Sequence, residues 1–216
     1  PHASVVCNFS EPSGEQTSLL SFREVSTLFH EFGHALHNIL AQTTFPGLSG
    51  TSVAWDFVEL PSQIFENWCY EPEALAIFAK HYQTGEDIPL EIVEKIKASG
   101  NFLEGIQFLR QLSLAKLDLS WHNKTADKIK SVKDHETEVI KDMTLFPKVN
   151  SVCTSTGFSH IFQGGYAAGY YSYKWAEVLD ADAYDYFKSK GIFNPEVALK
   201  FKTLLSLGGT ENQAVL

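Results

Sequence analysis

The chain has 216 residues, of which 44% are hydrophobic, and it carries a formal net charge of −9. This composition allows a substantial buried core, while the acidic balance, with only scattered lysines at 124–133, argues against nucleic acid or an anionic membrane as a partner. No apolar run approaches the roughly 18 residues that span a bilayer, and three widely separated cysteines without a C-x-x-C pair argue against a disulfide framework and favour a reducing compartment, the cytoplasm.

The first predicted element is a helix over about residues 22–41. Ser21 and Glu24 have the spacing of a capping box, with serine at the N-cap and glutamate three residues later. Apolar residues then recur at helical spacing until Pro46 and Gly47 end the pattern. These apolar residues are Val25, Leu28, Phe29, Phe32, Leu36, Ile39 and Leu40. Because this face is strongly apolar, we expect the helix to be buried.

The same helix carries the sequence H-E-F-G-H at 30–34, which matches H-E-x-x-H. Residues four apart share a helix face, so His30 and His34 can offer two imidazole nitrogens to one ion. Glu31 lies beside the first imidazole, where its carboxylate can reach a metal-bound water as a general base. The alternative is a chance match, in which two core histidines have hydrogen-bond partners and the glutamate is exposed.

A zinc site needs a third protein ligand, and two carboxylates compete for this role. The long metzincin pattern requires Gly at 37 and His at 40, where this chain has His37 and Leu40. Glu59 lies in a mostly apolar segment, so its carboxylate is expected to be buried and to gain from coordination. Glu66 is the rival, two turns further along the same helical stretch. We favour Glu59, because the residues after Glu66 are typical of a helix end.

The rest of the chain predicts further helices and few strands. The helices are expected at 72–82, 89–98, 102–122, 134–146, 167–188 and 194–207. The only strand candidates are residues 4–9 and 151–158. There are no repeats and no linker long enough to divide domains. We therefore expect residues 1–216 to form one mainly α domain with at most minor β structure.

Three blocks of sequence occur in order along the chain, HEFGHALH at 30–37, DFVELPSQIFENW at 56–68 and FSHIFQGGYAAGYYSYKW at 158–175. Together they resemble the thimet oligopeptidase family of zinc peptidases. The similarity extends over most of the chain, and the third block is most similar to the bacterial peptidyl-dipeptidase (dipeptidyl carboxypeptidase) branch. The resemblance implies a multi-helix zincin-type catalytic domain that binds one Zn²⁺ per chain.

The resemblance also implies roles for single residues. The family's zinc ligands match His30, His34 and Glu59, and its general base matches Glu31. In such a site, zinc and the glutamate activate water for attack on the scissile carbonyl, and the glutamate passes the proton to the leaving amine. The implied function is a zinc metallopeptidase that hydrolyses short, unstructured peptides.

In the third block, His160, Tyr166 and Tyr173 match residues that line the site and stabilise the transition state. Imidazole and phenol donors aimed at a developing oxyanion each lower the barrier by a few kcal/mol. Gly164 and Gly165 predict a turn, which can also approach a substrate closely or move as a flap. Packing is the favoured role for the other aromatic residues of this block, which are Tyr170, Tyr171 and Trp175.

Members of the resembled family are several times longer than this chain, whose only methionine is Met143. We therefore expect a fragment of a longer protein, with short peptides and the missing N-terminal part of the same protein as its partners. One alternative is a catalytically incompetent fragment, which binds metal or peptide but needs the rest of its domain for turnover. The sequence also leaves open whether cleavage is internal or releases C-terminal dipeptides.

Overall fold

The computed structural model describes residues 2–14, 17–146, 149 and 151–212. As predicted, these residues are mainly α-helical, and their one β contact is an isolated bridge between Lys80 and Asp87. The chain divides into two compact units, unit 1 (Pro1–Gly100 and Trp175–Leu216) and unit 2 (Asn101–Lys174). Within the described ranges, no helix is both long enough and apolar enough to cross a membrane.

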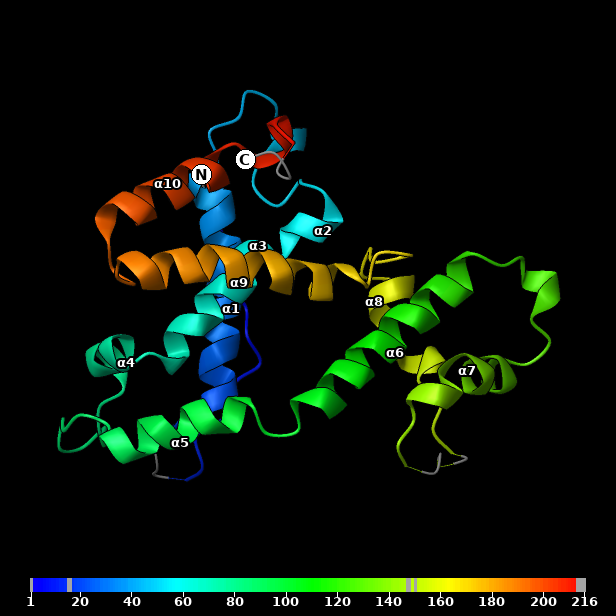
Figure 1. Ribbon diagram of the computed structural model, residues 1–216, viewed down its shortest axis with the longest axis horizontal. Coiled ribbons are helices and arrows are strands. Elements are labelled where there is room, and N and C mark those ends of the chain that lie inside the picture. The colour runs from blue at the N-terminus through cyan, green and yellow to red at the C-terminus, as the bar shows by residue number, and fades with distance from the viewer. Residues whose placement is uncertain (1, 15–16, 147–148, 150, 213–216) are drawn as a thin grey trace. The chain divides into compact units, whose positions relative to one another are not determined.

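Unit 1 is built around α1 (Phe22–Leu40), which lies beside α3 (Leu60–Glu66) and also contacts α10 (Pro195–Ser206) (Figure 1). Its remaining helices are α2 (Trp55–Val58), α4 (Pro72–Phe78), α5 (Leu90–Gly100) and most of α9 (Ser172–Lys190). Short 3-10 turns occur at Pro46–Leu48, Asn67–Tyr70 and Gly208–Thr210. The side chains of its main core cluster are Ile64, Ala74, Tyr184, Phe187, Ile192 and Val197.

The N-terminus of α1 has the predicted capping box. The Glu24 backbone N–H donates to the Ser21 hydroxyl at 3.3 Å, and the Ser21 N–H donates to the Glu24 carboxylate at 2.7 Å. The Glu24 carboxylate also accepts hydrogen bonds from Ser10, and these bonds lower its pKa to about 2. The predicted helix 22–41 is thereby confirmed to within one residue.

Fewer residues of α1 are buried than its apolar pattern predicts. The fully buried positions are Gly33, Ala35 and His37. Leu28, Phe32 and Ile39 remain 36–48% exposed, so the expectation of a buried apolar face is only partly correct. The reason is that α1 packs mainly on the side occupied by α3 and α10 within unit 1.

Gly33 determines how closely α1 and α3 approach each other. A Cβ atom added at Gly33 would lie 2.2 Å from the Pro61 carbonyl oxygen and 2.6 Å from the Ser62 Cα. Both atoms belong to the backbone of α3, so neither can move aside as a flexible side chain would. A larger residue at position 33 would therefore force the two helices apart.

Unit 2 contains α6 (Glu104–His122), α7 (Val132–Ile140), α8 (Ser159–Phe162) and the first residues of α9. Helices α6 and α7 pack against each other. The short 3-10 turns of this unit lie at Ala126–Lys128, Lys141–Met143 and Ser155–Gly157. Its core cluster consists of Leu114, Ala115, Leu117, Phe158, Ile161 and Tyr170. Unit 2 therefore has a hydrophobic core of its own.

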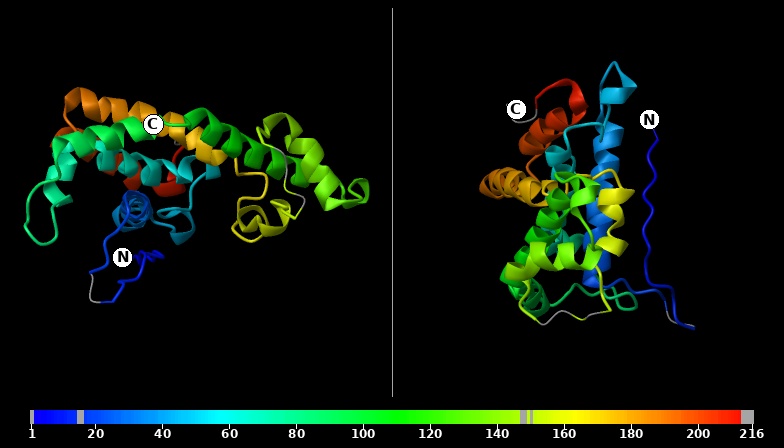
Figure 2. Two further views of the ribbon diagram at one scale, coloured as in Figure 1. Left: turned by 90° about the horizontal axis from the view of Figure 1, so that it is seen from below. Right: turned by 90° about the vertical axis from the view of Figure 1, so that its right-hand side faces the viewer.

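Two local predictions are wrong. Residues 4–9 and 151–158 are not strands; the first run is extended but has no pairing partner among the described residues (Figure 2), and the second contains the 3-10 turn at 155–157. The helix predicted at 167–188 begins only at Ser172. Ala168, with φ +56°, interrupts helical geometry before that point. The other predicted helices agree within a few residues, except that α4 and α7 end earlier.

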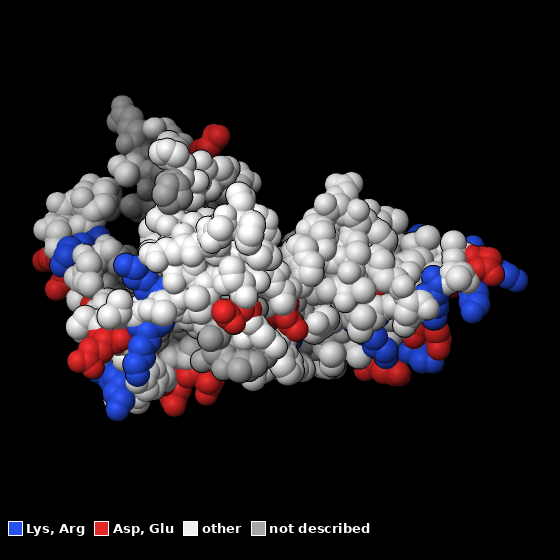
Figure 3. All heavy atoms as spheres, turned by 90° about the horizontal axis from the view of Figure 1, so that it is seen from above, with Lys and Arg blue, Asp and Glu red and all other residues white. Residues whose placement is uncertain are grey.

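Charged side chains of opposite sign are mixed on the face drawn in Figure 3. Among the described residues, Glu71 pairs with both Lys97 and Lys188 at 3.3 Å, and Lys141 pairs with Glu138 at 2.7 Å. Exposed pairs such as Lys141–Glu138 are screened by water and add little to stability. On this face the lysines and arginines do not gather into a positively charged patch.

We expect Gly33→Ala to destabilise the chain by about 1–3 kcal/mol, because the new methyl group overlaps the backbone of α3. Thermal unfolding followed by circular dichroism measures the change. Gly105→Ala in α6 is the matched control, since a Cβ there meets no atom within 4 Å. The control should be neutral or stabilising by up to about 1 kcal/mol. Equal unfolding temperatures for Gly33→Ala and the parent chain would contradict the close helix crossing.

Candidate metal centre

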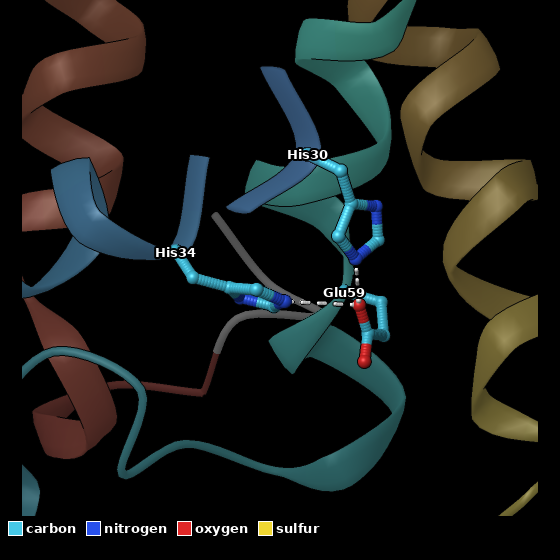
Figure 4. Close-up of side chains that lie close together, drawn as sticks. All are labelled: His30, His34 and Glu59. Carbon is cyan, nitrogen blue, oxygen red and sulfur yellow. Dashed lines mark ion pairs between the residues drawn. The ribbon is translucent and has the colours of Figure 1, made fainter. Parts of the chain in front are cut away.

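The two histidines of H-E-x-x-H and one carboxylate converge where α1 crosses α3. His30 and His34 project from adjacent turns of α1, with ring centroids 5.1 Å apart. Their Nε2 atoms lie 3.3 Å and 3.2 Å from one carboxylate oxygen of Glu59 (Figure 4). All three ligand atoms fall within 4.8 Å of one another, so these residues could hold a metal ion. Two imidazoles and a carboxylate are a donor set that suits zinc.

Glu59 occupies a break between two helical pieces. It follows α2 and precedes α3, and its backbone dihedrals are φ −88° and ψ −8°. The side chain is only 2% exposed, which confirms the predicted burial. The Ser62 hydroxyl lies 2.9 Å from both the Glu59 carboxylate and its main-chain carbonyl, and its single O–H is shared between these two acceptors. A buried carboxylate is costly without partners, so the hydroxyl and the two imidazoles explain how this site tolerates it.

Glu66, the rival candidate, contacts a different atom. Its carboxylate lies 2.7 Å from His30 Nδ1, the ring nitrogen that faces away from Glu59, and it also accepts from the Ser26 hydroxyl at 3.2 Å. Since α3 ends at Glu66, the predicted position near the helix end is confirmed. A carboxylate at Nδ1 fixes the ring orientation and leaves Nε2 directed at the site. The geometry thus separates the two carboxylates: Glu59 lies with the Nε2 atoms and Glu66 lies behind His30.

The two carboxylates change the protonation of His30. Burial lowers the pKa of His30, but hydrogen bonds and charge interactions with Glu59 and Glu66 outweigh this effect and raise the pKa to about 9. In the metal-free chain, His30 is therefore protonated at pH 7 and forms an ion pair with each carboxylate. Because a metal takes the lone pair of a neutral imidazole, a proton and a metal compete for Nε2.

The histidines outside the ligand cluster differ in burial. His37 is fully buried, and its ring nitrogens have no hydrogen-bond partner among the described residues. It packs edge-on against Phe57, and burial lowers its pKa to about 4. This favours a packing role over a contact with a ligand. His81 and His122 are exposed, whereas His135 is half-buried against Trp121.

In unit 2, the third sequence block brings together the three residues predicted from it. Tyr166 and Tyr173 stack with ring centroids 5.1 Å apart, and His160 lies 6.3 Å and 6.5 Å from them. The turn at Gly164 and Gly165 makes this possible. Gly165 has φ +87°, and a Cβ at Gly164 would lie 2.9 Å from the His160 carbonyl oxygen. The chain reverses there, and the Tyr166 N–H donates to His160 O. The predicted turn is confirmed.

The three aromatic residues of this block that were expected to have a packing role differ in burial. Tyr170 is 8% exposed and belongs to the core of unit 2, as predicted. Tyr171 and Trp175 are 42% and 52% exposed, so neither is a core residue. The sequence interpretation did not single out Ser62. The signal available in the sequence was the spacing, because Ser62 lies three residues after Glu59 at a helix start. This spacing brings the two side chains together.

Comparison with known proteins gives one family and several close relatives. The model of peptidase family M3 matches residues 1–216. Oligopeptidase A of Escherichia coli is 45% identical over 214 residues, which cover 98% of this chain and 32% of that protein. A probable cytosolic oligopeptidase A of Arabidopsis thaliana is 46% identical, with 97% and 31% covered. Dipeptidyl carboxypeptidase of Escherichia coli is 40% identical, with 96% and 31% covered.

The chain belongs to peptidase family M3. This confirms the resemblance to the thimet oligopeptidase family and the predicted class of protein, a family of metallopeptidases. The chain spans 31–32% of the length of the three relatives named above.

Separate substitutions of Glu59 and Glu66 distinguish a zinc ligand from a residue that only forms a hydrogen bond to a ligand. We expect Glu59→Ala to remove most of the bound zinc after dialysis, because an acceptor is lost from the cluster itself. Glu66→Gln should retain zinc but weaken its affinity by about 10- to 100-fold, the usual effect of losing a ligand's hydrogen-bond partner. Elemental mass spectrometry and zinc titration measure both. Unchanged zinc in Glu59→Ala would transfer the ligand role to Glu66.

Zinc uptake at pH 7 should release about one proton from His30, whose pKa of about 9 keeps it protonated in the metal-free chain. Near pH 9 the release should fall to roughly half a proton, and zinc affinity should rise between these pH values. Calorimetric titration in buffers of different ionisation enthalpy measures the protons. Glu66→Gln is the control, since it removes one of the carboxylates that hold the proton. An enthalpy independent of the buffer at pH 7 would contradict the prediction.

Proposed function

We propose that this chain carries the zinc-binding and catalytic residues of a metallo-oligopeptidase. The observation that supports this most is the convergence of His30, His34 and Glu59 within 4.8 Å, on the H-E-x-x-H helix of a peptidase-family chain. One Zn²⁺ per chain, held by these residues, would act as a Lewis acid on water and on the scissile carbonyl. The donor set of two imidazoles and one carboxylate supports zinc.

Glu31 is the proposed general base. It follows His30 on α1 and is half-buried beside the ligand cluster. Its carboxylate takes a proton from the attacking water and delivers it to the nitrogen of the leaving amine, so that the C–N bond breaks without expelling an amide anion. A positioned carboxylate of this kind contributes about 10²–10⁴-fold to the rate.

His160, Tyr166 and Tyr173 are the proposed substrate and transition-state residues. The stacking of the two phenols beside the imidazole supports a shared role, because it holds the three rings within 5.1–6.5 Å of one another. When the carbonyl is attacked, negative charge develops on its oxygen. A phenol O–H or an imidazole N–H that donates to this oxygen stabilises the transition state more than the ground state.

Short peptides are the proposed substrates. The names of the relatives support this, since two are oligopeptidases and one is a dipeptidyl carboxypeptidase. Mass spectrometry of the products from an unstructured peptide of about ten residues distinguishes the two modes of cleavage. C-terminal dipeptides alone indicate sequential release, whereas internal fragments of several lengths indicate an oligopeptidase. Amidation of the peptide C-terminus should abolish only the first mode. We also propose a cytoplasmic location, which the three free thiols support.

A second candidate function is a metal- or peptide-binding chain that turns over only together with further parts of a longer protein. An apolar hollow of about 410 Å³ in unit 1 favours it. Leu36 of α1, Trp68, and Phe193 and Phe201 near α10 are among its lining residues. Exposed apolar surface of this kind usually contacts another protein segment. Zinc near one per chain without any product from peptides would support this second function.

We expect Glu31→Gln to retain zinc while peptide hydrolysis falls by about 10²–10⁴-fold, because the amide is isosteric but cannot accept the water's proton. Zinc content and initial rates on one peptide measure the two effects. Glu11→Gln, a change of the same type at an exposed position, is the control and should keep both properties. Near-normal turnover by Glu31→Gln would exclude the general-base role, whereas loss of zinc would show that the variant disturbs the cluster.

A further inference from the structure

A second fully buried carboxylate, Asp118, lies in unit 2 and holds the backbone of the tyrosine segment. Asp118 belongs to α6 and is 0% exposed. Its Oδ1 accepts from the Ala168 N–H at 2.9 Å, and its Oδ2 accepts from the Tyr170 N–H at 2.8 Å. His122, one helical turn further on, contacts Oδ1 through Nδ1 at 2.8 Å. One carboxylate therefore holds two backbone groups that are some fifty residues away in sequence.

The held segment is a strained turn. Ala168 has φ +56°, in the left-handed region that residues with a Cβ rarely adopt. The turn is closed by the Gly169 N–H, which donates to Tyr166 O at 2.8 Å. Such a conformation persists only where the surroundings impose it. The two bonds to Asp118 lie on either side of Gly169 and impose this conformation directly.

This turn connects the two stacked tyrosines. Tyr166 lies two residues before Ala168, and Tyr173 lies three residues after Tyr170. Tyr170 itself is buried in the core and contacts Tyr173 with ring centroids 5.0 Å apart. The direction in which both phenols point therefore depends on the turn between them.

We propose that Asp118 is a positioning residue for Tyr166 and Tyr173, which acts by fixing the backbone turn at 168–170. The proposal rests on the proposed function of these tyrosines in catalysis. Without Asp118, two backbone N–H groups of the turn would lose their acceptor, and the turn could relax from its strained conformation. A carboxylate is suited to this place because its two oxygens can accept from two N–H groups that point the same way.

The test is Asp118→Asn, which keeps the size of the side chain but turns one acceptor into a donor that faces a backbone N–H. We expect the amide protons of Ala168 and Tyr170 to exchange at least about tenfold faster with solvent. Glu136→Gln is the matched control. Glu136 is also buried, and it accepts from the Thr154 and Ser155 N–H groups, so this variant should loosen residues 154–155 and leave 168–170 protected.

The kinetic part of the test separates positioning from stability. In Asp118→Asn, kcat should fall about 10- to 100-fold with KM within about threefold, because displaced donors lose contact with the transition state rather than with bound peptide. Tyr166→Phe should then cost less in the Asp118→Asn background than in the parent chain. Thermal unfolding checks that the variant is folded. If it is not, Asp118→Ser, whose hydroxyl reaches only one of the two N–H groups, takes its place.

The outcomes are distinguishable. Unchanged exchange of Ala168 and Tyr170 in a folded Asp118 variant overturns the proposal, and so do fully additive effects of Asp118→Asn and Tyr166→Phe on kcat. If Tyr166→Phe alone leaves kcat unchanged, the proposed function of Tyr166 fails and the catalytic part of this proposal fails with it. The exchange measurement needs no turnover, so it still decides whether Asp118 fixes the turn.

Discussion

The close crossing of α1 and α3 at Gly33 is the constraint on which the candidate metal centre depends. The glycine lets the backbone of α3 approach α1 so closely that no side chain fits between them. Only then does Glu59, at the start of α3, reach the face that carries His30 and His34. Here the glycine of the motif supplies the contact distance, and the two histidines supply the chemistry.

Buried carboxylates recur in both units, and each has directional partners. Glu59 accepts from Ser62, while Asp118 and Glu136 accept from pairs of backbone N–H groups. A buried carboxylate is unfavourable unless such partners are present, so each position is tied to one geometry. In unit 1 this geometry completes the candidate metal cluster. In unit 2 it fixes loops that have few hydrogen bonds of regular secondary structure.

Structural features that depend only on residues close in sequence could be predicted from local patterns. The capping box, the range of α1 and the turn at Gly164 follow from spacings of a few residues, and all are confirmed. The late start of α9 could not be predicted, because Ala168 is held in a left-handed conformation by a carboxylate fifty residues earlier. The predicted strand at 4–9 failed for a related reason. Its residues are extended, but a strand also requires a partner, which no local pattern reveals.

The burial of Glu59 was predictable from its apolar surroundings, whereas the contact between Glu66 and His30 needed the relative placement of two helices. The negative charge of Glu66 has two effects on His30 through that contact. It directs Nε2 of His30 at the site, and together with Glu59 it raises the pKa of His30 to about 9. In the metal-free chain the protonated ring then bridges both carboxylates. Its folded-state pKa lies above the ordinary value of 6.5, so this contribution to stability is complete below about pH 6.5.

The same contribution is lost as the pH rises through about 9, where His30 gives up its proton and the two carboxylates lose the charge between them. A zinc ion would supply positive charge at the same place, but it would first have to displace the proton from Nε2. In the metal-free chain the protonated ring thus stabilises the ligand cluster, with its two nitrogens paired to Glu59 and Glu66. Because the three ligand atoms already lie within 4.8 Å of one another, little reorganisation would be needed for metal uptake.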